Sequence, residues 1–164
     1  MSDDRKLIQA MMEYESGCPE RIQHFIKVYQ FAKLIGEEEA LDEQTQHILQ
    51  TAAIVHDIGI RPALLKYGSD AGKLQEQEGI KPAEELLHRL GYDTSVIERV
   101  AYLVGHHHTY TNVEGEDYQI LLEADFLVNL YENRCDEAAV KSAYEKIFRT
   151  ETGKRMCRVM FGME

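Results

Sequence analysis

Side chains of the kind that bind metal ions stand at three places far apart in this 164-residue chain. They are His24, the adjacent pair His56 and Asp57, and Asp125. The pair closes an apolar stretch at residues 48–55, and Asp125 lies inside a second apolar stretch at residues 120–128. An ionised carboxylate among apolar neighbours is costly unless a cation or a hydrogen-bond donor meets it. Two imidazoles and two carboxylates could meet on one divalent cation.

Each of these residues also has a purely structural interpretation. His24 could be a core histidine bonded to a carbonyl, the His-Asp pair a helix cap with a solvated aspartate, and Asp125 the partner of a buried arginine. Gly59 favours a ligand role for the pair, because a glycine in left-handed backbone can end the helix just beyond it. Asn129, one turn after Asp125, could hydrogen-bond that carboxylate.

Three consecutive histidines, His106, His107 and His108, follow another apolar stretch. They could form a solvated loop or contribute to metal binding. Successive side chains cannot all face one pocket. We therefore expect His106, with or without His107, to face inward, and His108 to be structural or exposed.

Three cations lie between the His-Asp pair and the next predicted helix, namely Arg61, Lys66 and Lys73. Guanidinium and ammonium groups suit phosphate oxygens. Each could equally be an ordinary solubilising charge.

The composition predicts the helices that must position these groups. Apolar residues make up 44% of the chain and only three prolines interrupt it. Apolar spacing predicts helices at about residues 4–14, 19–39, 42–56 and 76–90, with a short helical turn and a loop at 60–72. A fifth long helix is expected to begin with a Ser95–Glu98 capping box, or to be capped by Asp93, and to end near residue 105. A helix around Asp125 and one or two C-terminal helices complete an all-α fold.

The charge balance limits the partners. With 18 basic and 29 acidic residues the formal net charge is −11, which argues against general nucleic-acid binding and against anionic membrane surfaces. A small phosphorylated molecule stays possible, because a bound divalent metal reverses the charge locally. Three scattered cysteines without a Cys-x-x-Cys motif, no signal-peptide pattern and no stretch of membrane-spanning length predict a cytoplasmic protein.

The chain resembles the HD superfamily of metal-dependent phosphohydrolases. The family pattern is a histidine, a His-Asp pair and a distant aspartate, here His24, then His56-Asp57 in the segment AAIVHDIG, then Asp125 in EADF. The resemblance covers about residues 20–133. It implies a single HD-type domain over residues 1–164, with the metal site at helix ends in the bundle core and with residues 134–164 forming C-terminal helices.

The resemblance also implies the ligands. His24, His56, Asp57 and Asp125 would hold one ion, and Glu78, His106 and His107 are candidates for a second site, as in two-metal relatives. The donor set suits iron, manganese, zinc, cobalt or nickel, as one or two ions. The Gly-Tyr-Pro signature of cyclic-di-GMP phosphodiesterases is absent after the histidine triplet. Ile60 replaces a lysine that often follows the HDIG segment, leaving its role to Arg61 or Lys66.

The activity implied is hydrolysis of a phosphate ester or anhydride of a small metabolite, with a nucleotide as the expected class. A metal would lower the pKa of a water molecule toward about 7 to 9, and the hydroxide would attack phosphorus. His56, Asp57, Arg61 and Lys66 are the expected catalytic residues, and Arg61, Lys66 and Lys73 the substrate contacts. Two alternatives are a nucleotide- or metal-sensing HD module without turnover and an acidic helical interaction protein. The sequence does not specify the oligomeric state, and a homodimer is one of the states compatible with it.

Overall fold

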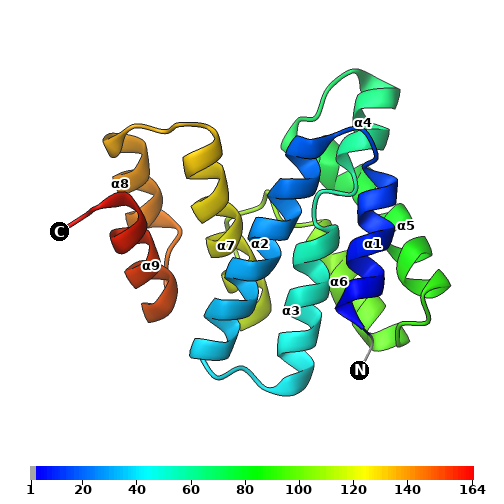
Figure 1. Ribbon diagram of the computed structural model, residues 1–164, viewed down its shortest axis with the longest axis horizontal. Helices are drawn as coiled ribbons and strands as arrows, with labels where there is room; N and C mark the ends of the chain where they lie inside the picture. Colours follow the sequence, from blue (N-terminus) through cyan, green and yellow to red (C-terminus); the bar gives the residue numbers. More distant parts are fainter. Residues whose placement is uncertain (1–2) are drawn as a thin grey trace.

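The computed structural model describes residues 3–164, and this part of the chain forms nine α-helices and no β-strand (Figure 1). The prediction of an all-α fold is confirmed. The helices are α1 (Asp4–Tyr14), α2 (Pro19–Glu38), α3 (Glu43–Val55), α4 (Ile60–Tyr67), α5 (Gly72–Arg89), α6 (Thr94–Val104), α7 (Glu116–Glu132), α8 (Glu137–Lys146) and α9 (Glu151–Phe161).

The predicted bounds of the first three helices are confirmed to within about two residues. Helix α3 begins where expected because the Asp42 side chain accepts a hydrogen bond from the Thr45 backbone N–H. The expected capping box on α6 is wrong: Ser95 lies inside the first turn, and Asp93, in extended backbone, is the N-cap residue. Helix α5 starts at residue 72, four residues earlier than predicted.

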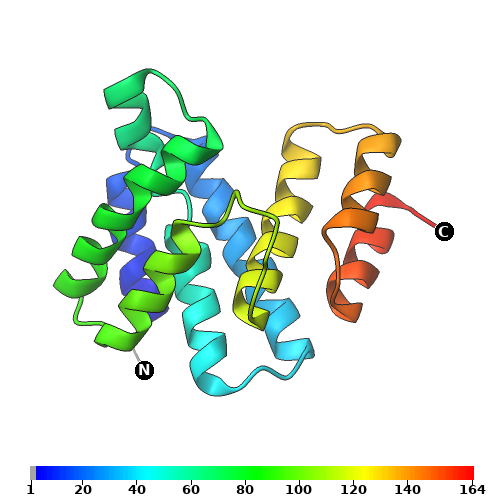
Figure 2. The same cartoon turned by 180° about the vertical axis from the view of Figure 1, so that it is seen from behind.

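The helices that carry the candidate ligands lie side by side. Helix α2 contacts both α3 and α7, and α3 also contacts α6 and α7. Helix α6 pairs with α5 on the side seen in Figure 2. Helices α8 and α9 form a hairpin beyond α7, at the other end of the molecule from α1 and α5 (Figure 1). Residues from the two halves of the chain therefore meet between α2, α3 and α7.

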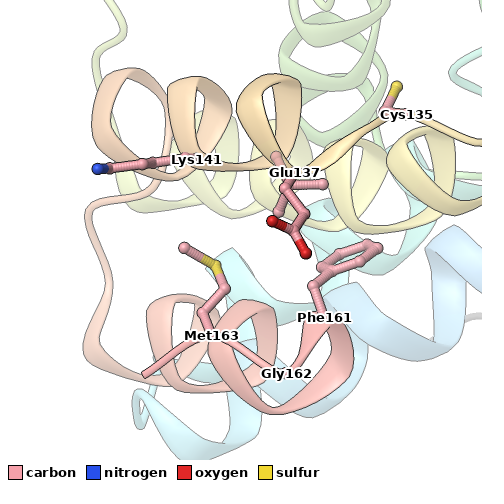
Figure 3. A pocket seen from close by; sticks show the side chains of 7 residues that line it. Cys135, Glu137, Lys141, Phe161, Gly162 and Met163 are labelled. Atoms are coloured by element: carbon pink, nitrogen blue, oxygen red, sulfur yellow. The ribbon is translucent and has the colours of Figure 1, made fainter.

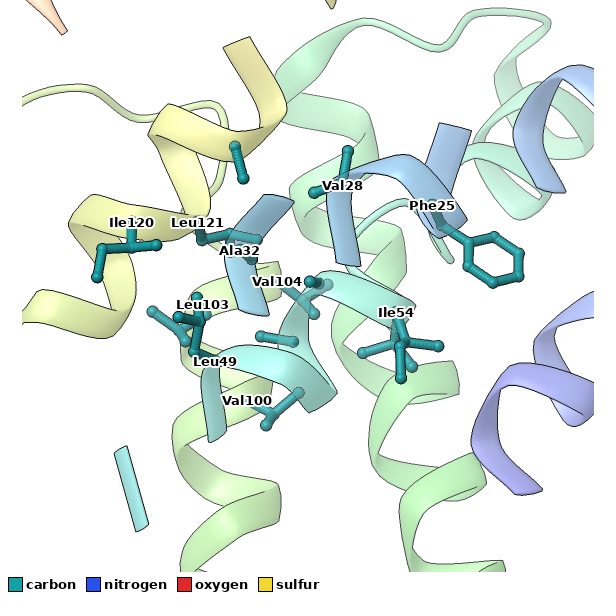
Figure 4. Close-up of a cluster of buried hydrophobic side chains, with 14 of the residues drawn as sticks. Phe25, Val28, Ala32, Leu49, Ile54, Val100, Leu103, Val104, Ile120 and Leu121 are labelled. Atoms are coloured by element: carbon teal, nitrogen blue, oxygen red, sulfur yellow. The ribbon is translucent and has the colours of Figure 1, made fainter. Parts of the chain in front are cut away.

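The apolar core occupies the space between α2, α3, α6 and α7 (Figure 4). Each of these helices contributes fully buried side chains, such as Val28, Leu49, Val100 and Ile120. Alanines at positions 32, 52, 53 and 124 are also fully buried, which lets the helices approach closely. A polar side chain on the inner face of α2, α3 or α7 is thereby held away from water.

One stretch in the described part, Glu43–Tyr67, is long and apolar enough by length and composition to cross a membrane. The expectation that no stretch reaches this length is therefore wrong. The apolar window is 61% buried inside the molecule, and helix α3 ends at Val55, before α4 begins. The core helix of a soluble protein passes the same test, so the burial of the stretch explains its composition.

Candidate metal centre

The four residues singled out by type and spacing converge in the core. His24 Nε2 lies 3.1 Å from Asp57 Oδ2 and 3.1 Å from Asp125 Oδ1. His56 Nε2 lies 3.3 Å and 3.4 Å from the same two atoms. The two Nε2 atoms are 3.3 Å apart. Side chains separated by up to 101 residues in the chain thus face one point.

The end of α3 presents the His-Asp pair. His56 is the C-cap residue and keeps helical backbone, and the following residues continue in tight turns through the hydrogen bonds Ile58 N→Val55 O and Ile60 N→Asp57 O. The expected left-handed conformation of Gly59 is wrong, since its φ is −77°. Glycine is needed there because α5 passes close by: a Cβ atom would lie 2.7 Å from Gly79 N and 2.9 Å from Gly79 Cα.

Hydrogen bonds at Nδ1 fix the tautomers of the histidines. His56 Nδ1 lies 2.7 Å from the Ala53 carbonyl and His107 Nδ1 lies 2.7 Å from the Val104 carbonyl. A carbonyl can only accept, so both Nδ1 atoms carry the hydrogen. His24 Nδ1 lies 2.7 Å from Glu132 Oε1. In the neutral rings, each Nε2 then presents a lone pair toward the carboxylates, the arrangement found in metal-bound histidines.

His24, His56, Asp57 and Asp125 form a cluster whose two carboxylates need positive charge nearby. Burial lowers the pKa of His24, but hydrogen bonds to Asp125 and Asp57 outweigh it and raise the pKa to about 10. Burial likewise lowers the pKa of His56, and the negative charges of Asp57 and Asp125 raise it well above its usual value. The pKa of each aspartate is lowered despite burial, mainly by the charge of His56. Protons or a metal ion must compensate the two carboxylates.

A divalent transition metal fits this donor set. Two groups of side chains each offer ligand atoms within 4.8 Å of one another: His24, His56 and Asp57, and Asp57, His107 and His108. His107 Nε2 is buried, 3.3 Å from Asp57 Oδ1, and makes no hydrogen bond of good geometry. Imidazole and carboxylate ligands suit zinc, iron, manganese, cobalt and nickel.

Asn129 and Glu132, both from α7, hold the ligands from behind. Asn129 Nδ2 donates to Asp125 Oδ1 at 3.1 Å, which confirms the hydrogen bond expected from their one-turn spacing. Glu132 binds His24 with one oxygen and Lys27 with the other, at 2.7 Å and 2.6 Å. The alternative interpretation paired Asp125 with a buried arginine. In the described part of the chain its partners are instead His24, His56 and Asn129.

Of the three consecutive histidines, His107 is the one that faces Asp57 of the cluster. The expectation that His106 faces inward is wrong. Helix α6 ends at Val104, and His106 turns back onto it, with Nδ1 2.7 Å from the Tyr102 carbonyl and the two rings stacked at 4.0 Å. His108 was expected to be structural or exposed, yet it belongs to the second candidate group.

Glu78, the candidate for the second site, is not brought to the cluster. Its Oε1 lies 2.5 Å from Lys66 Nζ in an ion pair. Gln75, in the first turn of α5, lies near the histidines instead, and its Oε1 lies 2.8 Å from His108 Nε2. Burial and the charge of His107 lower the pKa of His108 to about 4, so this imidazole is neutral and available as a ligand.

The predicted phosphate contacts also lie elsewhere. Lys66 pairs with Glu78, Lys73 with Glu76 at 3.2 Å, and Arg61 with Glu15 at 3.3 Å. Their roles in catalysis and substrate binding remain predictions.

Arg21 is the cation that the structure places beside the cluster, and sequence reasoning missed it. It precedes His24 by three residues on α2, and helical spacing puts such residues on one face. That spacing was the signal that could have identified it.

A hollow of about 490 Å³ opens over the cluster. His24, Asp57, Asp125 and His108 line it, together with Tyr110 and Phe126, whose rings meet edge to face at 5.3 Å. Another hollow, of about 430 Å³, lies between α8 and α9 and is lined by Cys135, Glu137, Val140, Lys141, Phe161, Gly162 and Met163 (Figure 3). It contains no histidine. The first hollow is therefore where a substrate would meet the candidate metal ligands.

Comparison with known proteins agrees with this geometry. The model of the HD domain family matches residues 21–143. A protein of Clostridium beijerinckii (strain ATCC 51743 / NCIMB 8052), itself uncharacterised, is 31% identical over 115 residues, which are 69% of this chain and 67% of the relative. The crystal structure of a predicted HD superfamily hydrolase from an uncultured Thermotogales bacterium matches with a TM-score of 0.69 and 25% identity, over 96% of this chain and 84% of that one.

Proposed function

The chain belongs to the HD domain family, and from that premise we propose that it is a metal-dependent phosphohydrolase. Its substrate would be a phosphate ester or anhydride of a small metabolite, with a nucleotide as the expected class. The observation that carries the proposal is the convergence of His24, His56, Asp57 and Asp125 under an open hollow. A protein that used these groups only for packing would not need them to face one point.

The ligands divide into two groups that share Asp57. Its Oδ2 faces His24 and His56, and its Oδ1 faces His107. We propose that His24, His56, Asp57 and Asp125 hold one divalent ion and that Asp57, His107 and His108 hold a second. When bound, such ions supply Lewis acidity toward phosphoryl oxygens and a water molecule of lowered pKa. The hydrogen bonds from Asn129 and to Glu132 keep the ligands oriented.

The remaining groups would bind and orient the substrate. Arg21 lines the hollow and can donate to phosphate oxygens. Tyr110 and Phe126 provide an aromatic wall, suited to the apolar face of a base or sugar. We expect a cytoplasmic protein that acts on small molecules, without nucleic-acid or membrane partners.

The test is a combined measurement of metal and turnover. We expect the purified protein to contain stoichiometric transition metal and to release phosphate from some member of a nucleotide and sugar-phosphate panel when manganese is added. Asp57→Ala removes a ligand shared by both groups, so it should abolish phosphate release and lower the metal content. Glu145→Ala, an exposed carboxylate on α8, is the control and should behave as the wild type.

Two results would contradict the proposal in different ways. Tight nucleotide binding without turnover would indicate a sensing module. Protein without stoichiometric metal, whose stability does not respond to chelation, would indicate that the polar core residues only bridge one another.

A further inference from the structure

The hollow over the cluster is strongly acidic. Besides the partly exposed Asp57 and the buried Asp125, it is lined by Glu20, Asp70 and Glu132. Arg21 is the one lysine or arginine among its lining residues in the described part of the chain. Two divalent ions would more than neutralise the two inner carboxylates, Asp57 and Asp125. The outer ones, of which Glu20 and Asp70 are exposed, would keep their charge toward any ligand that extends outward.

The Glu15 carboxylate fixes the position of the Arg21 guanidinium. Its Nε donates to Glu15 Oε2 at 2.7 Å, and the Glu15 side chain is only 1% exposed. Within residues 3–164, no hydrogen bond joins the terminal guanidinium nitrogens of Arg21 to another protein group. A guanidinium fixed through Nε keeps its terminal N–H groups for an anion. Arg61 binds the other oxygen of Glu15 without lining the hollow.

We propose that this site selects phosphate monoesters, with Arg21 as the contact for the single phosphate and with the outer carboxylates rejecting diphosphates and triphosphates. The inference rests on the proposed function and narrows its substrate class. A second or third phosphate would need further cations, and Arg61, Lys66 and Lys73 are all paired with glutamates. Glu20 and Asp70, which line the hollow and are exposed, would instead face that added negative charge, which is repulsive.

The reaction is balanced as simple hydrolysis. A water oxygen forms a bond to phosphorus, the ester P–O bond breaks, and the leaving alkoxide takes a proton from that water. The products are an alcohol and inorganic phosphate. Carboxylates and the amides of Asn129 and Asn133 line the same hollow and can hydrogen-bond the hydroxyl groups of such an alcohol.

The first test compares AMP, ADP and ATP with manganese-loaded protein. We expect kcat/KM to be higher for AMP than for ADP or ATP by about tenfold or more, as like charges a few ångströms apart imply. Equal or faster hydrolysis of ADP or ATP would overturn the selectivity while leaving the phosphohydrolase proposal intact. No phosphate release from any member of the panel would remove the proposed function, and the inference with it.

Two substitutions test the residues themselves. Glu20→Gln removes one outer charge, so the preference for AMP over ADP should shrink several-fold, while metal content stays the same. Arg21→Ala should lower kcat/KM for AMP by about 100-fold, mainly through KM, since a charge-assisted bidentate contact is lost. Arg21→Lys should recover part of this loss. Arg89→Ala, an exposed arginine on α5, is the matched control.

Arg21→Ala leaves Glu15 Oε2 without its donor, and the variant could fail to fold for that reason. Arg21→Gln covers this case, because glutamine can still donate to that oxygen. If the Arg21 variants bind metal normally and hydrolyse AMP as well as Arg89→Ala does, Arg21 is not the phosphate contact. If Glu20→Gln leaves the AMP to ADP ratio unchanged, the outer carboxylates do not set the selectivity.

Discussion

At the scale of single residues, a substitution of Glu132 tests whether its hydrogen bond to His24 strengthens metal binding. It accepts the Nδ1 hydrogen of His24 and pairs with Lys27. Glu132→Gln keeps an acceptor but removes the charge that makes the imidazole a stronger ligand, so metal affinity should fall by about tenfold. Competition with a chromophoric chelator measures this. Glu145→Gln serves as the control, and an unchanged affinity in Glu132→Gln would show that this contact does not tune the ion.

The raised pKa of His24 predicts that the folding stability of the metal-free protein depends on pH. The pKa of His24 is 6.5 when unfolded and about 10 when folded, so its contribution to stability is complete below pH 6.5 and is lost as pH rises toward 10. The aspartates have lowered pKa values, and their contribution is lost on acidification below about pH 4. With a chelator present, the melting temperature should fall between pH 6.5 and 10.

The same pH series on metal-loaded protein should not show that fall, because ligand deprotonation strengthens metal binding. Melting curves by circular dichroism at matched ionic strength compare the two states. Identical pH profiles with and without metal would mean that His24 does not exchange protons for a cation.

The candidate site was predictable from residue types only in part. Histidine and aspartate at apolar positions identify His24, His56, Asp57 and Asp125, because burial of such groups needs a reason. The choice among three consecutive histidines depends on where α6 ends and on the stacking of His106 on Tyr102. No local pattern shows that Lys66 pairs with Glu78 or that Glu15 holds Arg21, since these partners meet only in the folded chain.

At the scale of helices, the close approach of α5 to the His-Asp turn gives the next prediction. Gly59→Ala places a methyl group against Gln75 O and the Gly79 backbone, and backbone atoms cannot rotate away. We expect a destabilisation of about 3 kcal/mol by denaturant unfolding, typical of overpacking, together with weaker metal binding, because His56 and Asp57 would shift.

Gly68→Ala is the matched control for this substitution. Gly68 has a φ of +63°, and a methyl group added to it would meet no other atom within 4 Å. Its cost should be only about 1 to 2 kcal/mol, from left-handed backbone strain, with metal binding unchanged. Equal losses of stability and metal affinity in the two variants would mean that α5 does not restrain the turn.

The helices themselves were largely predictable, because apolar periodicity and cap residues act locally. Asp42 and Pro19 mark the starts of α3 and α2 as expected. The exceptions lie where tertiary contacts decide. Residues 60–67 form a full helix because α4 packs on α5, and Gly59 is dictated by the neighbouring backbone rather than by its own turn.

At the scale of the whole molecule, the candidate ion acts as a cross-link. The second proposed ion would bind the loop after α6 to the end of α3. The first would have ligands from α2, the end of α3 and α7, so this one ion would join residues up to 101 positions apart in the chain. Removing it would leave buried carboxylates facing one another with only protons as compensation. Metal binding and folding should therefore be strongly coupled.

Chelation should lower the melting temperature of the wild-type protein. An ion present at about 100 times its Kd contributes about 2.7 kcal/mol to the folded state, which for a chain of this size corresponds to about 5–11 °C. Differential scanning calorimetry before and after treatment with a strong chelator measures the shift, and adding manganese or zinc back should restore it. Asp57→Ala should melt at the same temperature with and without chelator, because its shared ligand is gone. A wild-type protein equally indifferent to chelation would show that protons alone hold these helices together.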